Sequence, residues 1–422
     1  MSAGSRLYLD NAATSFPKPP AVLDAMVRYQ RELGASPGRG SYRESVEGGA
    51  ILTRCREVLA ELINAEPSES AEEAGTAANR IAFTLNTTDA LNQAIYGLVR
   101  QRRRAGRTRT HLITTAMDHN SVLRPFNALT EDGDVEWTCV PVDPVSGLVD
   151  PDEIASAIER DTALVAIVHG SNVSGTVQPI GEIGAVCREH AVPLLVDAAQ
   201  TIGHMPIDVR EMGIDLLAFP GHKGLLGPLG TGGLYLRPGM ERVVATSREG
   251  GTGSVSELDR HPDAMPDRYE CGSHNTIGLA GLAEGARWLQ LRGVAELWTH
   301  ERELMRVALE GLSDEASMPG LRLLGPQGLA HRLGVFSMTH AEIPAERFAS
   351  ELEERFGVLV RAGIHCAPRA HESFGTHPEC APEGQGGAFR MSFGPFVTPQ
   401  DVSYACHAIS EVCRTAAAAP VR

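Results

Sequence analysis

The chain has 422 residues, of which 42 % are hydrophobic and 22 % charged, as in ordinary soluble proteins of two or three domains. Its 53 acidic residues outnumber 38 basic ones, and the net charge of −15 argues against nucleic acid and anionic membrane as partners. No apolar run approaches the roughly 18 residues of a membrane span, and the N-terminus lacks the apolar core of a signal peptide. We therefore expect a cytoplasmic protein.

Between about residues 80 and 240, two sequence patterns alternate. Short apolar runs predict strands at residues 81–85, 111–115, 163–169, 192–197, 214–219 and 232–237. Segments with helical periodicity lie between several of them, at residues 88–101, 151–160 and 180–191. This alternation predicts βαβ units, and hence an α/β fold with a mainly parallel sheet covered by helices on both faces.

After about residue 280 the character of the sequence changes. Helical patterns at residues 277–293 and 296–312 are followed by a strand pattern at 331–340, a helix at 345–357 and strands at 358–363 and 389–394, before a closing helix. This order predicts a second, smaller α+β domain.

Residues able to do chemistry follow the ends of the predicted strands, where ligands of such sheets bind. Asp197 ends one strand, with Gln200 three residues on, and the next strand runs into a glycine-rich segment that holds His222 and Lys223. A lysine in such a loop is usually solvated, but a desolvated lysine has a lowered pKa and can form a Schiff base. A carboxylate facing it suits a pyridinium nitrogen, which indicates pyridoxal 5′-phosphate as the cofactor.

The cofactor's phosphate needs hydrogen-bond donors. Thr87 and Thr88 lie between a strand and a helix opened by Asp89, and free N–H groups at a helix N-terminus bind anions. The plain alternative is an ordinary threonine N-cap. His119 follows another strand and offers a ring face on which the cofactor can stack.

Eight segments make the chain resemble a known family. In chain order they are YLDNAATSFPKP, TTDALN, DHNSVLRP, HGSNVSGT, VDAAQT, GHKGLLGPLGTGGLY, GGTGS and RAGIHCAP, spread over nearly the whole chain. Together they resemble the class V aminotransferase-like family, and within it the cysteine desulfurases of the SufS-like branch with its selenocysteine lyase relatives. The resemblance implies the fold-type I pyridoxal-phosphate architecture, with a mainly parallel, seven-stranded sheet in the large domain. It also implies an N-terminal segment near the active site (1–20), a large cofactor-binding domain (21–280) and a small α+β domain (281–422).

The resemblance implies a role for each matching residue. Lys223 would hold the cofactor covalently, while Asp197 would pair with its pyridine nitrogen and Gln200 with its ring hydroxyl. The other implied contacts are His119 on the ring, Thr87, Thr88 and His222 at the phosphate, Asn172 beside the ring hydroxyl and substrate carboxylate, Ser273 from a partner subunit, and Asn11, Arg361 and Arg390 for the substrate. For His119, pure stacking and proton transfer are both open. The resemblance also implies a homodimer, because Ser273 would act across subunits.

Two positions depart from the family pattern. Pro220 precedes Gly-His-Lys where Ser or Thr is usual, and residues 272–275 read Gly-Ser-His-Asn where Gly-Thr-Pro-Asn is usual. Both lie in segments that the resemblance places at the phosphate, so they bear on the affinity for the cofactor rather than on its identity.

Cys366 is one of eight cysteines, which show neither a C-x-x-C pair nor zinc-ribbon spacing and fit a reducing compartment. Its segment matches the Arg-x-Gly-x-x-Cys-Ala pattern that carries the persulfide-forming cysteine in the resembling enzymes. Arg361 and His365 are placed to favour a thiolate. Adjacent His365 and Cys366 cannot easily share one ion, so we expect no metal site. An inert core thiol is the alternative.

The sequence therefore predicts an enzyme, a pyridoxal-phosphate-dependent cysteine desulfurase with Cys366, Lys223 and His119 as catalytic residues. It would convert L-cysteine to L-alanine and leave a persulfide on Cys366 for an acceptor protein, with iron–sulfur cluster assembly as the expected use. One alternative is a selenocysteine lyase, or another C–S lyase or aminotransferase, in which Cys366 is not catalytic. The other is a non-enzymatic docking scaffold for a sulfur carrier. The sequence specifies neither the acceptor nor a preference between sulfur and selenium.

Overall fold

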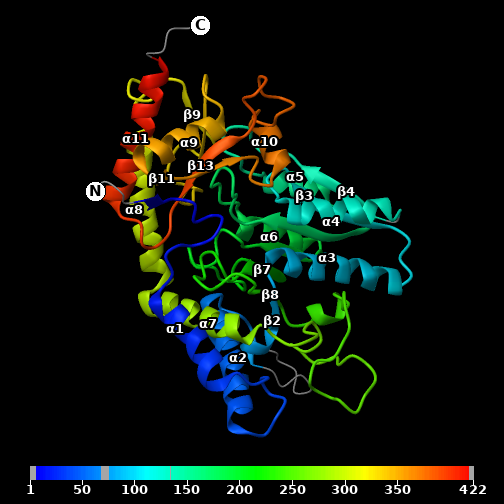
Figure 1. Ribbon diagram of the computed structural model, residues 1–422. Helices are drawn as coiled ribbons and strands as arrows, with labels where there is room; N and C mark the ends of the chain where they lie inside the picture. The colour runs from blue at the N-terminus through cyan, green and yellow to red at the C-terminus, as the bar shows by residue number, and fades with distance from the viewer. Residues whose placement is uncertain (1–5, 68–75, 134, 418–422) are drawn as a thin grey trace.

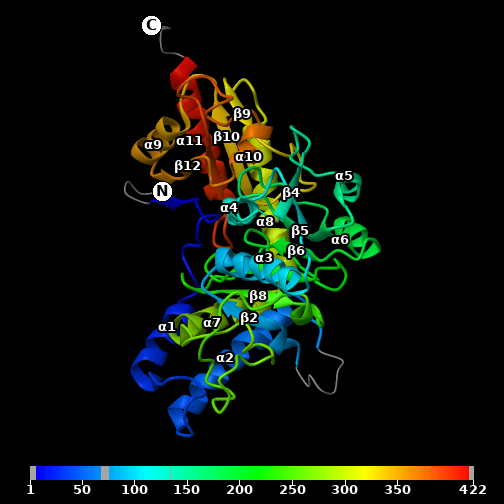
Figure 2. The same cartoon turned by 90° about the vertical axis from the view of Figure 1, so that its right-hand side faces the viewer.

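A computed structural model describes residues 6–67, 76–133 and 135–417, so residues 1–5 and 418–422 of the expected terminal domains lie outside it. Seven strands form one sheet in the order β2-β8-β7-β6-β5-β3-β4 (Figures 1 and 2). Neighbouring strands are parallel except β8, which is antiparallel to β2 and β7. The strands are β2 (Ile81–Thr84), β3 (Thr110–Thr115), β4 (Val135–Val140), β5 (Thr162–Val168), β6 (Leu194–Asp197), β7 (Leu216–Pro220) and β8 (Gly232–Leu236). The predicted α/β architecture is confirmed.

Helices cover both faces of this sheet, because successive side chains of each strand point to opposite sides. On β6, Leu194 and Val196 join a core with α2, α6 and α7 (Thr276–Arg292), whereas Leu195 joins a core with α3 and α4. The helices before α7 are α1 (Pro20–Arg28), α2 (Arg43–Leu62), α3 (Thr87–Arg104), α4 (Asn120–Glu131), α5 (Pro151–Ala157) and α6 (Ile180–Glu189). Burial on both faces explains the continuous apolar runs of these strands.

A second, antiparallel sheet has the order β12-β13-β10-β9. Its strands are β9 (Leu321–Leu323), β10 (Val335–His340), β12 (Arg361–Gly363) and β13 (Ala388–Ser392). Phe336 and Phe389 of this sheet share a core with Phe348 and Ile409. That core is formed with α8 (Val294–Leu312), α9 (Ala345–Phe356) and α11 (Pro399–Ala417), while the short helix α10 (Pro368–Ser373) follows β12. The C-terminal part is thus a smaller α+β unit.

The helix α7 (Thr276–Arg292) crosses the expected domain boundary at residue 280. Its buried Leu279, Leu282 and Leu289 belong to the core of the seven-stranded sheet, whereas α8 contributes to the core of the small unit. Gly293, with φ of 80°, separates the two helices in a conformation that favours glycine. We therefore propose that the large domain extends to Arg292; the division into domains stays a prediction.

The strand β4 is absent from the expected elements. It lies at the edge of the sheet, and its side chains run from buried Val135 through exposed Glu136 to buried Val140. An edge strand needs no continuous apolar run, and the polar residues of β4 break the apolar pattern by which the other strands were predicted. Alternation with period two was the signal that could have found it.

A buried ion pair joins the two units behind the lysine loop. His204 Nδ1 lies 2.7 Å from Glu301 Oε2 of α8, and Glu301 Oε1 accepts the Gly334 N–H at 2.8 Å. Burial disfavours the charged imidazole, but the Glu301 carboxylate outweighs it and raises the pKa of His204. A Cβ built on Gly224 would lie 2.6 Å from the His204 ring, so the ring packs directly on the segment that follows Lys223.

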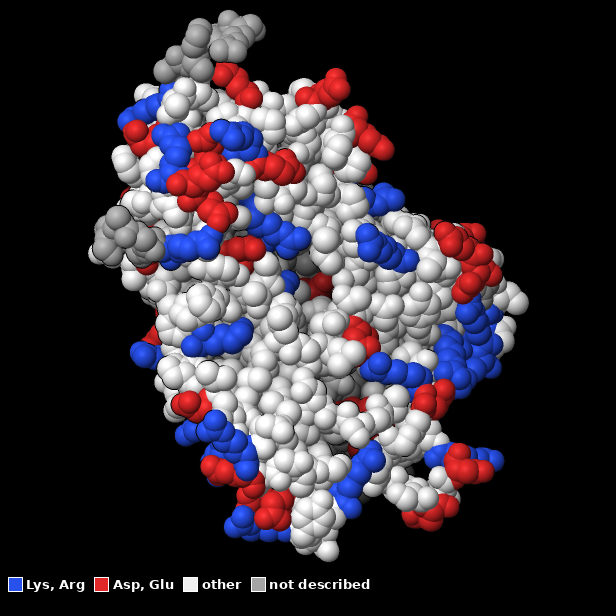
Figure 3. Space-filling model, in the orientation of Figure 1, with Lys and Arg blue, Asp and Glu red and all other residues white. Residues whose placement is uncertain are grey.

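Charged side chains of both signs are intermixed over the face drawn in Figure 3. Many charged side chains among the described residues pair locally, as Arg306 does with Glu303 and Glu310. The blue area at the right edge of this face lies directly below acidic side chains, so basic and acidic groups adjoin there as well. Within the described residues, no helix combines the length and apolar character needed to cross a bilayer.

Candidate active site

A cavity of about 250 Å³ lies at the carboxyl ends of the parallel strands, the usual ligand site of such sheets. Its walls are Asn86, Thr87, Thr88, His119, Ser121, Val168, Gly170, Asn172, Asp197, Ala199, Gln200, His222 and Lys223. Eight of the nine residues predicted to bind the cofactor are among them. They come from segments as far apart as α3 and the loop after β7, so the fold alone brings them together.

Asp197 and Lys223 face the same cavity, and burial shifts their pKa values in opposite directions. Asp197 is 3 % exposed and accepts the Ala199 N–H at 2.9 Å; burial raises the pKa of its carboxyl to about 6. Burial lowers the pKa of Lys223 to about 8 against the attraction of Asp197, and the positive charges of Arg390 and Arg361 lower it further. A buried carboxylate suits a pyridinium partner, and a lysine with a lowered pKa is a nucleophile near neutral pH.

The rate at which cofactor-free protein captures pyridoxal phosphate is expected to rise with pH through a midpoint of about 8, not 10.5. Only the neutral amine reacts, and a lowered pKa makes it available at lower pH. Stopped-flow absorbance of the covalently bound cofactor measures this profile. Burial also lowers the pKa of Lys18 to about 8, so Lys18→Met is the control and should keep the midpoint. A midpoint near 10.5, or its loss in Lys18→Met, would contradict the assignment to Lys223.

His119 caps the helix α4. Its Nδ1 accepts the N–H of Ser121 at 3.1 Å and lies 2.8 Å from the Ser121 hydroxyl. An accepting Nδ1 places the ring proton on Nε2. Burial lowers the pKa of His119 to about 4, helped by the positive Lys223, so the ring is neutral. The cap fixes the orientation of the ring, and Nε2–H carries the one proton it can transfer.

The donors around Thr88 fit a phosphate group. Thr87 and Thr88 begin α3, where backbone N–H groups have no partner within the helix. The Thr88 hydroxyl lies 2.8 Å from that of Ser121. His222 Nδ1 is buried without a hydrogen-bond partner among the described residues, and burial lowers the pKa of this ring to about 4. Ser121 was missed from the sequence; its place two residues after a helix-capping residue is the signal that could have found it.

Two arginines lie side by side on neighbouring strands next to this cavity. Arg361 of β12 is the cross-strand partner of Arg390 of β13, an arrangement that like charges destabilise unless an anion is near. Arg390 is 1 % exposed; its Nη2 lies 2.6 Å from Asp10 Oδ1, and its Nη1 donates to the Asn172 carbonyl at 3.0 Å. Asp10 offsets one of the two positive charges, and the pair suits a substrate carboxylate as the second anion.

The N-terminal segment packs against the walls of the cavity. Gln200 Nε2 donates to the Ala12 carbonyl at 3.1 Å, and the Thr14 hydroxyl donates to the His222 carbonyl at 3.0 Å. Asn11 is buried, with its amide donating to the Ser392 carbonyl and its Oδ1 accepting the Phe16 N–H, both at 3.2 Å. Asn11 thus shapes this turn, and its contact with substrate stays a prediction.

Cys366 is exposed, unlike the buried Cys55, Cys187, Cys406 and Cys413, so it is not a core thiol. Its carbonyl accepts the Asn120 N–H at 2.9 Å. The preceding His365 is neutral, because burial lowers the pKa of its ring well below 6.5. His365 is therefore uncharged beside Cys366, and its expected part in favouring the thiolate stays a prediction.

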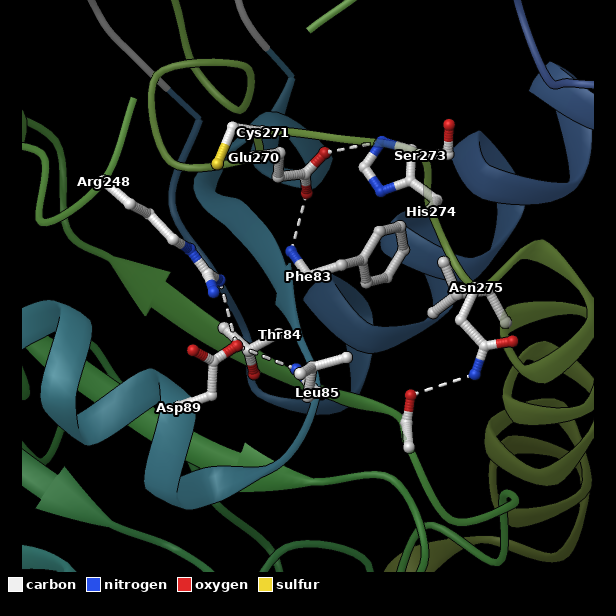
Figure 4. A pocket seen from close by; sticks show the side chains of 12 residues that line it. Phe83, Thr84, Leu85, Asp89, Arg248, Glu270, Cys271, Ser273, His274 and Asn275 are labelled. Carbon is white, nitrogen blue, oxygen red and sulfur yellow. Dashed lines mark hydrogen bonds and ion pairs between the residues drawn. The ribbon is translucent and has the colours of Figure 1, made fainter. Parts of the chain in front are cut away.

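Ser273 is the predicted cofactor residue that does not line the Lys223 cavity. It is exposed beside a separate hollow of about 210 Å³ near Phe83, Cys271 and Asn275, where its side chain points away from the Asp89–Arg248 ion pair (Figure 4). The neighbouring His274 lies 3.2 Å from Glu270, which also accepts the Phe83 N–H at 2.6 Å. Within one chain, Ser273 is therefore not part of the Lys223 site.

Comparison with known proteins decides the family. The family model of the aminotransferase class-V proteins matches residues 7–404. This chain belongs to the aminotransferase class-V family. The resemblance drawn from the eight motifs is confirmed. Members of this family depend on pyridoxal 5′-phosphate, and the carboxylate, lysine and phosphate donors around Lys223 fit that group, so the cofactor prediction is confirmed as well.

Several similar proteins are named as cysteine desulfurases. A probable cysteine desulfurase of Methanothermobacter thermautotrophicus is 33 % identical over 410 residues, which cover 96 % of this chain and 94 % of that protein. A cysteine desulfurase of Salmonella dublin is 32 % identical over 377 residues, covering 88 % and 87 %. The apo structure of a cysteine desulfurase from Thermococcus onnurineus NA1 superposes with a TM-score of 0.84 at 28 % identity, covering 97 % of this chain and 95 % of that one.

Proposed function

We propose that this protein is a pyridoxal-phosphate-dependent cysteine desulfurase, which converts L-cysteine to L-alanine and leaves a persulfide on Cys366. The proposal rests on the nearness of two features. The Lys223 cavity is lined by the residues expected to bind the cofactor. The exposed Cys366 lies beside it, because its carbonyl accepts the N–H of Asn120, which follows the cavity residue His119.

The chain's own residues account for the steps of this reaction. Arg390 and Arg361 orient the substrate carboxylate, and the Lys223 amine takes the α-proton. When bound, the cofactor acts as an electron sink for the carbon skeleton of the substrate. The Cys366 thiolate forms an S–S bond with the substrate sulfur while the substrate's Cβ–S bond breaks. The electron pair of that bond stays with the carbon skeleton, which takes up one proton at Cβ and regains the α-proton from Lys223 to become alanine, so no outside oxidant is required.

The direct test uses the purified, cofactor-loaded protein. Incubation with L-cysteine is expected to yield alanine, measured by chromatography, and one extra sulfur on the peptide that contains Cys366, measured by mass spectrometry. Addition of a thiol reductant should release that sulfur as sulfide. Alanine without sulfur on Cys366 would favour a lyase, and a colourless protein that turns over no amino acid would favour a docking scaffold.

A homodimer in the cytoplasm and a protein acceptor, with iron–sulfur cluster assembly as its use, belong to the same proposal. Support for the dimer comes from Ser273, which is exposed and outside the Lys223 cavity of its own chain. Sedimentation of the cofactor-loaded protein should give a dimer, and a fully active monomer would contradict it. Support for an acceptor is the exposure of Cys366, which allows a persulfide to be collected from outside.

A further inference from the structure

A strained turn carries Cys366. Residues 364–367, here called the thiol turn, are closed by the Ala367 N–H, which donates to the Ile364 carbonyl at 3.2 Å. The φ angles are 52° at His365 and 59° at Cys366. Positive φ at both central positions is the pattern of a type I′ turn, where Asn and Gly are favoured. His365 and Cys366 are neither glycine nor asparagine and are strained there, so the surrounding structure has to hold the turn.

Hydrogen bonds to both walls of the cavity hold the thiol turn. The Asn172 side-chain amide, which lines the cavity, donates to the His365 carbonyl at 2.6 Å. The Asn120 N–H, directly after the cavity residue His119, donates to the Cys366 carbonyl at 2.9 Å. Consecutive carbonyls of the turn are therefore fixed by the loop after β5, which holds Asn172, and by the first residue of α4, Asn120.

The His365 side chain anchors the turn from its other side. The ring is 3 % exposed, and its Nε2 lies 3.1 Å from the Ala388 carbonyl of β13, which makes Nε2–H the donor. The His371 ring packs beside it at a centroid distance of 5.8 Å, and His371 is held by Thr376 at 2.7 Å. The turn is thus fastened to the small unit as well as to the large one.

The burial of successive residues shows what this arrangement achieves. His365 and Ala367 are buried, yet Cys366 between them is exposed. A left-handed backbone reverses the chain within two residues, so the thiol projects outward between two anchored neighbours. Relaxation to negative φ would turn it away from this direction.

We infer that His365 is a positioning residue, whose buried ring holds the thiol turn between Ala388 and Asn172 and so fixes the Cys366 thiol relative to the cofactor cavity. This inference rests on the proposed desulfuration and adds a residue to it. The step it serves is the transfer of sulfur from the substrate Cβ to the Cys366 thiolate. Such a step depends on geometry, since a displacement of about 1 Å can lower a rate on the order of 100-fold.

The test compares two substitutions of His365 in the cofactor-loaded protein. His365→Ala should lower kcat for L-cysteine by about 10- to 100-fold with little change in KM, because it loosens the nucleophile and leaves the cavity residues in place. The absorbance of the bound cofactor should be retained. His365→Gln places an amide N–H where the imidazole Nε2 lies, and it should restore most of the lost kcat.

His340→Ala is the matched control. His340 is also a buried imidazole, with Nε2 3.0 Å from the Pro319 carbonyl, and its described contacts do not include the thiol turn. Its loss removes the bond to Pro319 and two bonds that Nδ1 accepts from the Glu342 and Ile343 N–H groups, so it should cost at least as much stability in urea unfolding as His365→Ala while keeping the wild-type kcat. Equal loss of kcat in both variants, or wild-type kcat in His365→Ala, would overturn the inference. So would failure of His365→Gln to restore kcat.

A second measurement needs no turnover. The rate of Cys366 alkylation by iodoacetamide, divided by the rate at the exposed Cys380, reports on the thiol turn with an internal reference. This ratio should fall in His365→Ala and stay at the wild-type value in His365→Gln and His340→Ala. A wild-type ratio in His365→Ala would overturn the inference. If the wild type does not desulfurate cysteine, the proposed function fails, and the alkylation ratio still decides the role of His365.

Discussion

Replacing Lys223 with alanine is expected to abolish the visible absorbance of the covalently bound cofactor and to lower alanine formation from L-cysteine by at least about 10³-fold, because one residue supplies both the nucleophile and the base. The substitution removes the amine whose pKa burial lowers to about 8, while Asp197 and His119 keep their places in the cavity. Absorbance spectra of the purified protein and a chromatographic alanine assay measure the two effects.

Lys223→Arg is the control for charge. Arginine keeps a positive charge beside Asp197 but cannot form the covalent link, so this variant should fail in the same way. Retained alanine formation in Lys223→Arg would assign Lys223 an electrostatic role, and a retained absorbance band in Lys223→Ala would exclude it as the cofactor-binding lysine.

Replacing Cys366 with alanine is expected to separate cofactor binding from sulfur transfer. Cofactor absorbance should be unchanged, because the cavity is lined by other residues. Formation of alanine and sulfide from L-cysteine should fall by about 100-fold or more, since the positioned nucleophile is lost. L-Selenocysteine should still be turned over, because selenium can leave without attack by a thiol.

Cys380→Ala is the matched control, because Cys380 is exposed as Cys366 is. It should keep the wild-type rate and the persulfide on Cys366. Near wild-type desulfuration by Cys366→Ala would refute the nucleophile and leave the lyase alternative in its place. A persulfide found on Cys271 or Cys380 in the wild type, and not on Cys366, would refute it equally.

The sequence was sufficient for six of the seven strands of the large sheet and for most of the cavity. Fully buried parallel strands leave continuous apolar runs, and the residues that end them, such as Asp197, meet at one edge because parallel strands share a direction. The nearness of Lys223 and Asp197 could therefore be predicted from the topology of the sheet alone. The family motifs supplied the remaining positions, such as Gln200 and Asn172.

Other features depend on contacts that no local pattern records. The neutrality of His365 follows from burial beneath β13, and the cap that orients His119 follows from the helix that begins after it. The membership of α7 in the large unit follows from packing with α2, which lies more than 200 positions earlier in the chain. Cys366 has a positive φ, and this could not be predicted from the sequence because the residue is not the glycine that usually marks such a conformation.

The pairing of β1 (Leu7–Tyr8) with β11 (Val358–Leu359) sets an order for the maturation of the enzyme. Leu7 of β1 pairs with Val358, which is made 351 positions later, and the Ala12 N–H donates to the Ser392 hydroxyl at 2.8 Å. At about 5–20 residues per second, synthesis of the intervening chain takes roughly 20–70 s. Throughout that interval the N-terminal segment, whose Thr14 donates a hydrogen bond to the His222 carbonyl, lacks its pairing with β11. We therefore expect secure attachment of the cofactor only after synthesis of the chain is complete. In a nascent chain stalled before residue 358, the N-terminal segment would not be held over Lys223.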